Sequence, residues 1–139
     1  MQNGEEPSLA PLVHCGVRFP DFDHCALTHL VVLAYVVNTE EISFGNTRLS
    51  GTIPNELWLA SENLNLLSMP NSEIQGTLSS DIGLATNLQI LNFVNTNLHG
   101  TIPSEIGLLS NSLEWLQLAS TNISGTIPSE LGLVTGLST

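Results

Sequence analysis

A four-residue phrase that recurs four times constrains the fold of this chain more than any other feature. The phrase is glycine, threonine and an aliphatic residue, followed in three copies by proline and in one by serine. Its copies begin at Gly51, Gly76, Gly100 and Gly125, which are 25, 24 and 25 residues apart. A fixed period in this range is typical of stacked-repeat solenoids, because one short unit cannot bury its apolar face alone. Residues at equal distances from these glycines should therefore form columns through the stack.

Six such columns are apolar, with Thr39 as the exception at the N-terminal edge. They lie twelve, nine, seven and two residues before the glycine, and two and six residues after it. The positions nine and seven before the glycine are separated by one residue, and this period of two predicts a strand. Stacked units would place these strands side by side in a parallel sheet. The columns are Thr39, Leu64, Leu88, Leu113; Ile42, Leu67, Leu91, Leu116; Phe44, Met69, Phe93, Leu118; Leu49, Ile74, Leu98, Ile123; Ile53, Leu78, Ile102, Ile127; and Leu57, Ile82, Ile106, Leu131.

The units follow the template L-x-x-L-x-L-x-x-N-x-L-x-G-x-I-P, which resembles the plant-type leucine-rich repeat that is also common in algae. The strongest copy is LEWLQLASTNISGTIP at residues 113–128, and the resemblance extends from Thr39 to the C-terminus. It implies an α/β repeat solenoid of the leucine-rich-repeat class, a curved superhelix with a concave parallel β-sheet and short helical or 3₁₀ turns on the convex side. A second short strand is implied at each Gly-Thr-Ile segment.

The resemblance also divides the chain. Residues 1–12 are predicted to form a disordered tail and residues 13–38 an N-terminal cap. Residues 39–139 would hold four leucine-rich repeats and the start of a truncated fifth, opened by Leu137. Because solenoid ends normally carry a polar capping unit and none follows Leu137, we expect the chain to be part of a longer protein.

Asn97 and Asn122 are expected to fill the asparagine position of the template. The resemblance implies that such asparagines form a buried ladder, in which each amide satisfies backbone groups of the turn and of the neighbouring repeat. Loss of a buried hydrogen bond of this kind costs about 1–3 kcal/mol. The first two repeats hold Arg48 and Glu73 at the equivalent positions, so the ladder is predicted to be irregular there.

The predicted cap contains both cysteines, in the pairs His14-Cys15 and His24-Cys25. Related repeat proteins carry a cysteine pair before the first repeat, so the resemblance implies a Cys15–Cys25 disulfide in an extracellular setting. Two free buried thiols are an alternative. A zinc site that adds His14, His24 or His29 is another, but adjacent His-Cys pairs lack the usual ligand spacing of such sites.

The net charge of the chain limits the classes of partner that it is expected to bind. The formal net charge is −11, with thirteen acidic residues against Arg18 and Arg48 and no lysine. Nucleic-acid binding needs a cationic surface and is not expected, and anionic membranes are disfavoured for the same reason. No apolar run is long enough to cross a bilayer, and the N-terminus shows no signal peptide. The resemblance nevertheless implies an extracellular or cell-surface location.

The sequence contains no phosphate-binding loop, nucleophile elbow or paired-histidine metal motif. Its strongest charged column stands five residues after each glycine and would suit calcium binding or acid catalysis. A structural role explains it better, because each acid follows a capping-type residue at the start of a predicted short helix, where the helix dipole favours negative charge. We therefore predict no enzyme activity, no cofactor and no metal site. The column is Glu56, Asp81, Glu105 and Glu130, after Asn55, Ser80, Ser104 and Ser129.

The binding surface of this family is the concave sheet, and its outward positions follow from the register. One outward column contains an acid and an apolar stripe, and the next is polar. An exposed apolar stripe that includes tryptophan favours protein or peptide recognition. Mutual coverage of side chains on neighbouring strands is the alternative explanation. The predicted binding residues are Glu41, Leu66, Ser68, Ile90, Asn92, Trp115 and Gln117.

A row of threonines suggests a second kind of surface, because regular threonine arrays occur on ice-binding β-solenoids. Strand propensity alone also explains threonine at a half-exposed strand position. The row is Thr52, Thr77, Thr101 and Thr126, and a second row of Thr47, Ser72, Thr96 and Thr121 runs roughly parallel to it.

The only N-glycosylation sequence in the chain is Asn122-Ile123-Ser124. Since Asn122 is expected to be buried in the asparagine ladder, a glycan there would disrupt the stack. We therefore predict that Asn122 is unmodified.

These observations predict a non-catalytic recognition module, part of a receptor-like ectodomain or of a secreted protein, that binds a protein, peptide or glycan ligand at its concave face. The receptor-like assignment rests on the resemblance alone. The alternatives are an inhibitor of cell-wall-degrading enzymes, similar to polygalacturonase-inhibiting proteins, and an ice-binding or structural surface protein. The oligomeric state does not follow from the sequence.

Overall fold

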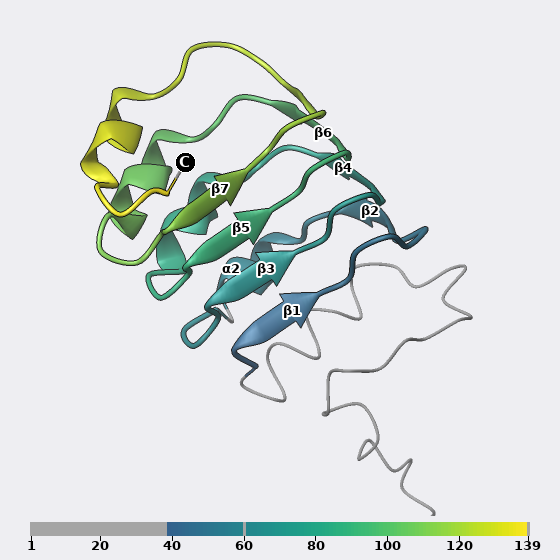
Figure 1. The fold of residues 1–139 in the computed structure, drawn as a ribbon, viewed down its shortest axis with the longest axis horizontal. Coiled ribbons are helices and arrows are strands. Elements are labelled where there is room, and N and C mark those ends of the chain that lie inside the picture. The colour runs from purple at the N-terminus through teal and green to yellow at the C-terminus, as the bar shows by residue number, and fades with distance from the viewer. Residues whose placement is uncertain (1–38, 60, 139) are drawn as a thin grey trace, which may run out of the picture.

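The computed structural model describes residues 39–59 and 61–138, so the predicted tail, cap and Cys15–Cys25 pair lie outside the described residues. Four similar units stack on one another, and each contributes one strand to each of two parallel sheets (Figure 1). The first sheet has the order β1-β3-β5-β7 and the second the order β2-β4-β6-β8. The first comprises β1 Glu41–Ser43, β3 Leu66–Ser68, β5 Ile90–Asn92 and β7 Trp115–Gln117. The second comprises β2 Ser50–Thr52, β4 Glu73–Gly76, β6 Asn97–Gly100 and β8 Asn122–Ile123.

A short helix follows each strand of the second sheet. The first, α2, is an α-helix and the other three are 3₁₀ helices, and consecutive helices pack against one another along the stack (Figure 1). The predicted leucine-rich-repeat solenoid, with a parallel sheet and short helical or 3₁₀ turns, is confirmed. No helix in the described residues is long and apolar enough to cross a membrane. The helices are α2 Asn55–Leu59, η1 Ser80–Leu84, η2 Ser104–Leu109 and η3 Ser129–Leu133.

The predicted capping residues of these helices were misplaced by one position. Each of them is the first residue of its helix, and the true N-cap of the 3₁₀ helices is the residue before it. Only the N-cap of η1 makes a side-chain bond there: the Ser79 Oγ accepts from the Asp81 N–H at 3.2 Å, whereas Pro103 and Pro128 have no side chain that can do so. The acids do occupy the first turns, as predicted.

The register of the first sheet agrees with the predicted one. Ile42, Leu67, Leu91 and Leu116 lie opposite one another on adjacent strands. The first three are buried and Leu116 is half-buried, whereas Glu41, the residue before Ile42, is exposed. In each three-residue strand the central residue therefore points inward, and its two neighbours face outward.

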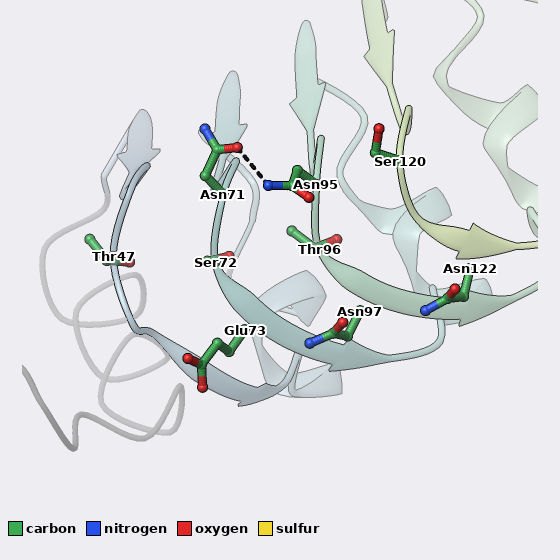
Figure 2. Close-up of a pocket in the computed structure, with 9 residues that line it drawn as sticks. All are labelled: Thr47, Asn71, Ser72, Glu73, Asn95, Thr96, Asn97, Ser120 and Asn122. Carbon is green, nitrogen blue, oxygen red and sulfur yellow. Dashed lines mark hydrogen bonds between the residues drawn. The ribbon is translucent and has the colours of Figure 1, made fainter.

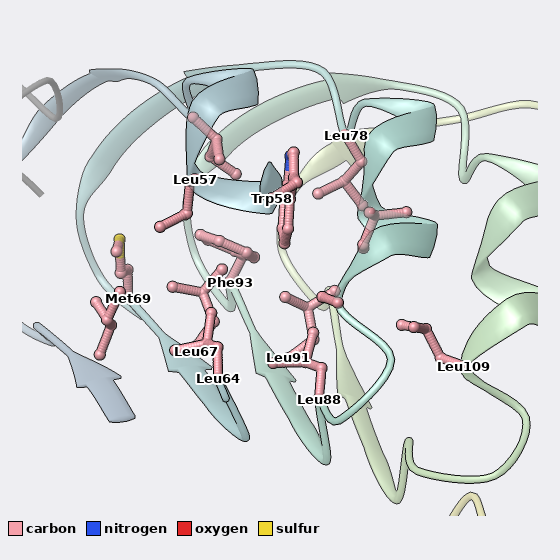
Figure 3. Packing of buried hydrophobic residues seen from close by; sticks show 14 of the residues in the cluster. Leu57, Trp58, Leu64, Leu67, Met69, Leu78, Leu88, Leu91, Phe93 and Leu109 are labelled. Carbon is pink, nitrogen blue, oxygen red and sulfur yellow. The ribbon is translucent and has the colours of Figure 1, made fainter. Parts of the chain in front are cut away.

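The interior is one apolar cluster built from the predicted columns (Figure 3). Ile127 departs from its column and is 74% exposed, because nothing in the described chain stacks on the last unit. Trp58 joins the cluster although the sequence patterns did not indicate it, and it is 1% exposed. The same repeat position holds Gly83 and Gly107 in the next two units, where a neighbouring helix lies close to the glycine. In the first unit the indole of Trp58 fills this place.

The recurring Gly-Thr pair has a packing role that joins consecutive units. The repeat glycines adopt positive φ between 84° and 109°, a region that glycine enters at little cost. A Cβ on Gly100 would lie only 2.9 Å from the Cγ2 atom of Thr77 in the preceding unit, and Gly76 and Gly125 face Thr52 and Thr101 in the same way. The threonine methyl thus packs over a surface that only glycine can present, which explains three of the four threonines without a ligand.

Candidate functional site

Seven residues were predicted to form the binding surface, and the structure places all of them on the outer face of the first sheet. We call this surface the strand face and define it by two rows of side chains that run across the four strands. The first row is Glu41, Leu66, Ile90 and Trp115, and the second is Ser43, Ser68, Asn92 and Gln117. The predicted register of these residues is confirmed, and their role in binding stays a prediction.

The first row of the strand face is a continuous apolar stripe with an acid at one end. Leu66 and Ile90 are half-buried, because each is covered partly by the side chains on either side of it. Trp115 is 40% exposed at the other end of the row. In the second row the Oδ1 atom of Asn92 accepts from the Val94 N–H at 3.1 Å, which leaves the two N–H donors of that amide for a ligand. The face therefore combines apolar contact area with oriented donors.

The prediction that Asn97 and Asn122 form a buried ladder was wrong. Both side chains are exposed, at the start of β6 and β8. Each directly precedes an inward residue, Leu98 or Ile123, so strand alternation turns the asparagine outward. The template asparagine lies four residues before the glycine, and the predicted pair lies three before it. Counting alternation back from Leu98 would have revealed the error.

The inward position four residues before the glycine holds hydroxyl residues, which the sequence analysis had assigned to a surface row. Ser72 and Thr96 are buried. The Ser72 Oγ donates to the Met69 carbonyl at 2.7 Å, and the Thr96 Oγ1 donates to the Phe93 carbonyl at 2.9 Å. Thr121 repeats this bond in the last unit. These hydroxyls satisfy carbonyls at the end of the first strand, and Arg48 and Glu73 are consequently no departure from the pattern.

A different set of asparagines does form a ladder, and it is exposed. The Asn71 Nδ2 donates to the Asn46 Oδ1 at 3.0 Å. The Asn95 Nδ2 donates to the Asn71 Oδ1, also at 3.0 Å (Figure 2). All three residues have φ between 54° and 57°, and Ser120 takes the same conformation in the fourth unit. Asparagine tolerates this left-handed region better than most residues. The ladder stops at Ser120, whose side chain is too short to continue it.

An open groove of about 400 Å³ runs beside this ladder, between the turns and the second sheet (Figure 2). Its lining is made of neutral amides and hydroxyls, with one carboxylate. The side chains three before the repeat glycines form one edge of the groove, and the buried hydroxyls lie between that edge and the asparagine ladder. The lining residues are Thr47, Asn71, Ser72, Glu73, Asn95, Thr96, Asn97, Ser120 and Asn122.

A row of exposed leucines on the helices was not found from the sequence, although it repeats with the same period. Their exposed fractions lie between 49% and 65%. Counting eight residues beyond each repeat glycine would have identified them. This row is the main competitor of the strand face as an apolar surface. It consists of Leu59, Leu84, Leu108 and Leu133.

The acids of the predicted charged column all lie at helix starts. Glu56, Asp81, Glu105 and Glu130 each occupy the first turn of a different helix. Within residues 39–59 and 61–138, no group of three or more histidine, cysteine, aspartate or glutamate side chains is arranged to hold a metal ion.

Comparison with known proteins agrees with this architecture. Residues 87–109 and 112–133 match the family model described as Leucine Rich Repeat. Comparison with curated proteins finds no match. The crystal structure of a TDR receptor is 32% identical, with a TM-score of 0.72, and the similarity covers 78% of this chain and 18% of that one.

Two further structures are from Arabidopsis. The receptor kinase HAESA, in complex with the peptide hormone IDA and the co-receptor SERK1, is 33% identical with a TM-score of 0.68, over 72% of this chain and 17% of that one. The LRR ectodomain of the receptor kinase SOBIR1 is 26% identical with a TM-score of 0.64, over 69% of this chain and 51% of that one. The chain thus spans less than a fifth of two of these structures and about half of the third. Its described part has the leucine-rich-repeat fold, similar to plant receptor ectodomains, which supports a protein-interaction module.

Proposed function

We propose that this chain is a non-catalytic recognition module that binds a protein or peptide at its strand face, as part of a receptor-like or secreted protein outside the cell. The observation that carries the proposal is the row formed by Leu66, Ile90 and Trp115, an apolar stripe that ends in an exposed tryptophan. Tryptophan is among the residues that contribute most to binding energy in protein interfaces.

The geometry of the strand face suits a peptide ligand. The row is held by backbone pairing between parallel strands, so its residues stand at a fixed spacing before the ligand arrives and little backbone entropy is lost on binding. The free amide donors of Asn92 stand in the adjacent row and can orient a peptide carbonyl. Glu41, at the end of the apolar row, favours a cationic group at that end of the ligand.

The similar structures support this proposal only in part. HAESA was solved with a peptide hormone and a co-receptor, and RGFR1 with the peptide RGF2. Each is covered by this chain over less than a fifth of its length. A peptide ligand for this chain therefore rests on the residues of its own strand face, and the similarity makes peptides the first class to test.

A displayed library of random peptides, selected against the purified chain, provides a probe for this face. We expect Trp115→Ala and Leu66→Ala to weaken the selected peptide at least about tenfold, which corresponds to about 1.4 kcal/mol. Leu59→Ala is the control, because Leu59 is 65% exposed but lies on α2, away from the first sheet. Binding that survives Trp115→Ala and disappears with Leu59→Ala would transfer the site to the leucine row.

Stability must be measured on the same variants, and the chain offers a matched pair of adjacent leucines for this purpose. Leu67 is fully buried and Leu66 is half-buried. Leu67→Ala should lower the free energy of unfolding by about 2–5 kcal/mol through cavity formation. Leu66→Ala should cost clearly less, so that its loss of binding cannot be attributed to unfolding. Denaturant titration of both variants gives the comparison, and equal costs would indicate that the assignment of inward and outward residues is inverted.

A further inference from the structure

The side chain of Asn122 lies at the surface and not in the predicted buried ladder. It is the first residue of β8, and Ile123 after it turns inward and is half-buried. Asn122 is consequently exposed, and so is Ser124, two residues further on. These residues form the only Asn-x-Ser/Thr sequence in the chain. The reason for expecting an unmodified asparagine, its burial in a ladder, does not hold.

The rest of the column shows that this position tolerates bulk. The equivalent residues in the earlier units are Arg48, Glu73 and Asn97, and all three are exposed. A long cation, a carboxylate and an amide thus occupy the same place without entering the core. Asn122 lies at the edge of the polar groove, so a group attached to it would extend along neutral amides and hydroxyls (Figure 2).

The Asn122 amide is also chemically free. Within the described part of the chain its side chain has no hydrogen-bond partner, whereas the amides of Asn71 and Asn95 are bonded in the exposed ladder. The main chain around it is fixed independently of the side chain, because β8 pairs with β6 and the Ser124 N–H donates to the Gly100 carbonyl at 2.7 Å. Substitution at the amide nitrogen therefore breaks no bond that holds the fold.

We propose that Asn122 is an N-glycosylation site and that its glycan covers the polar groove while leaving the strand face open. The donor is a lipid-linked oligosaccharide of the secretory pathway. The Asn122 Nδ2 atom forms a bond to the anomeric carbon of the first sugar, the bond from that carbon to the lipid pyrophosphate breaks, and the amide gives up one proton as the pyrophosphate leaves. The Ser124 hydroxyl completes the acceptor sequence. The proposal shares with the proposed function the requirement that the chain enters the secretory pathway.

The test is expression of the full chain behind a secretion signal, in a eukaryotic host that keeps its glycans in the high-mannose form. Cleavage after Glu114 and Glu130 releases peptide 115–130, which contains the whole acceptor sequence. We expect this peptide to carry a single N-acetylglucosamine after endoglycosidase H treatment. Asn122→Gln and Ser124→Ala should abolish the modification, and neither should shift the thermal midpoint of the protein.

A matched control comes from the preceding repeat, where Asn97 is exposed at the equivalent position but is followed two residues later by His99. His99→Ser completes an acceptor sequence there and should add a second glycan. An unmodified Asn122 in the secreted protein overturns the proposal, whether or not Asn97 becomes modified in this variant. If the chain is not secreted, translation in the presence of microsomes tests the same acceptor, and an unmodified product there has the same meaning.

Binding separates this proposal from the proposed function. The glycosylated protein and the Asn122→Gln variant should bind the selected peptide with equal affinity, because Asn122 lies on the second sheet and the strand face on the first. An unmodified protein that binds the peptide would overturn only the glycan. A glycosylated protein that binds nothing through Trp115 would overturn only the strand-face function. A glycan that blocks peptide binding would contradict the placement of the two surfaces.

Discussion

The polar residues just before each repeat glycine fall into two neighbouring columns with opposite environments. In the second, third and fourth units, the hydroxyl of the residue four before the glycine donates to a carbonyl at the end of the first strand, as Thr96 does to Phe93. The residue three before it points outward, as Asn97 does. A shift of one residue thus separates a buried structural hydroxyl from a surface amide, and the two should respond very differently to substitution.

Thr96→Val tests this assignment. Valine has nearly the shape of threonine, so the change removes the hydroxyl donor and leaves the Phe93 carbonyl unsatisfied in a buried place. We expect the free energy of unfolding to fall by about 1–3 kcal/mol. Asn97→Ala, one residue further on, should change it by less than about 0.5 kcal/mol because the side chain is exposed. Denaturant titration checks both values, and the reverse order would restore the asparagine as the ladder residue.

The turn between the two strands of each unit is the element at which the exposed ladder forms. In every unit, the third residue after the strand of the first sheet has a left-handed conformation, and three of the four units have asparagine there. The fourth uses Ser120, which has the conformational cost without the amide bond. Among the four turns, the turn that contains Ser120 is therefore the one whose sequence is least well matched to its backbone conformation.

Ser120→Asn should stabilise the protein. Asparagine accepts a positive φ more readily than serine, and its amide would stand beside the Asn95 Oδ1, as each earlier amide does in its own turn. We expect a gain of about 0.5–1 kcal/mol, which a thermal melt would show as a raised midpoint. Ser138→Asn, on another exposed serine without positive φ, is the control and should have no such effect. A destabilised Ser120→Asn variant would contradict the ladder as a stabilising element.

The helices show the same dependence on the neighbouring unit. A Cβ on Gly107 in η2 would lie 2.8 Å from the Cβ atom and 2.9 Å from the carbonyl oxygen of Glu130 in η3. At the equivalent Gly132 in η3, no atom would come within 4 Å. Glycine is therefore required at this repeat position only where the helix of the next unit packs against it.

Gly107→Ala and Gly132→Ala form a matched pair for this contact. The first should lower the free energy of unfolding by about 1–3 kcal/mol, because the helices must separate to admit the methyl group. The second should be neutral or raise it by up to about 1 kcal/mol, since alanine restricts the unfolded chain. Chemical denaturation of the two variants gives the difference, and equal effects would mean that helix propensity rather than packing determines the position.

At the scale of the whole molecule, each unit contacts only its neighbours, so stability depends on position in the stack. β5 pairs with strands on both sides, whereas in the described chain β7 pairs only with β5. The last unit also leaves Ile127 exposed, whereas the equivalent Ile53 and Leu78 are buried. Local unfolding should therefore begin at this end and spread toward the centre.

Hydrogen exchange measures this gradient directly. We expect the Trp115 amide in β7 to exchange at least about tenfold faster than the Ile90 amide in β5, because opening the last unit exposes less apolar surface than opening the molecule. Each of these amides opens its strand and donates to the preceding unit at 3.0 Å, Trp115 to the Gln89 carbonyl and Ile90 to the Asn65 carbonyl, so each is the control for the other. Uniform exchange rates across the four strands would show instead that the stack unfolds as one cooperative unit.

Several features of this protein could be predicted from particular residues of its sequence. The spacing of Gly51, Gly76, Gly100 and Gly125 established the period, and the alternation around Leu67 and Leu91 gave the strand register. Both signals are local, since a strand alternates with a period of two whatever surrounds it. The predicted strand-face residues follow from the same alternation, which is why all of them lie on one surface.

Other features depend on contacts between units and could not be obtained by counting. Trp58 stands where the next two units have a glycine against a neighbouring helix, and the Thr77 methyl fits against Gly100 of the next unit. The polar groove likewise arises from the way the second sheet stands beside the turns. The sequence by itself determined which residues repeat and which of them face inward along a strand. Only the tertiary structure decided which surfaces stay open and which side chains of neighbouring units meet, because these depend on how closely units 24 or 25 residues apart approach one another.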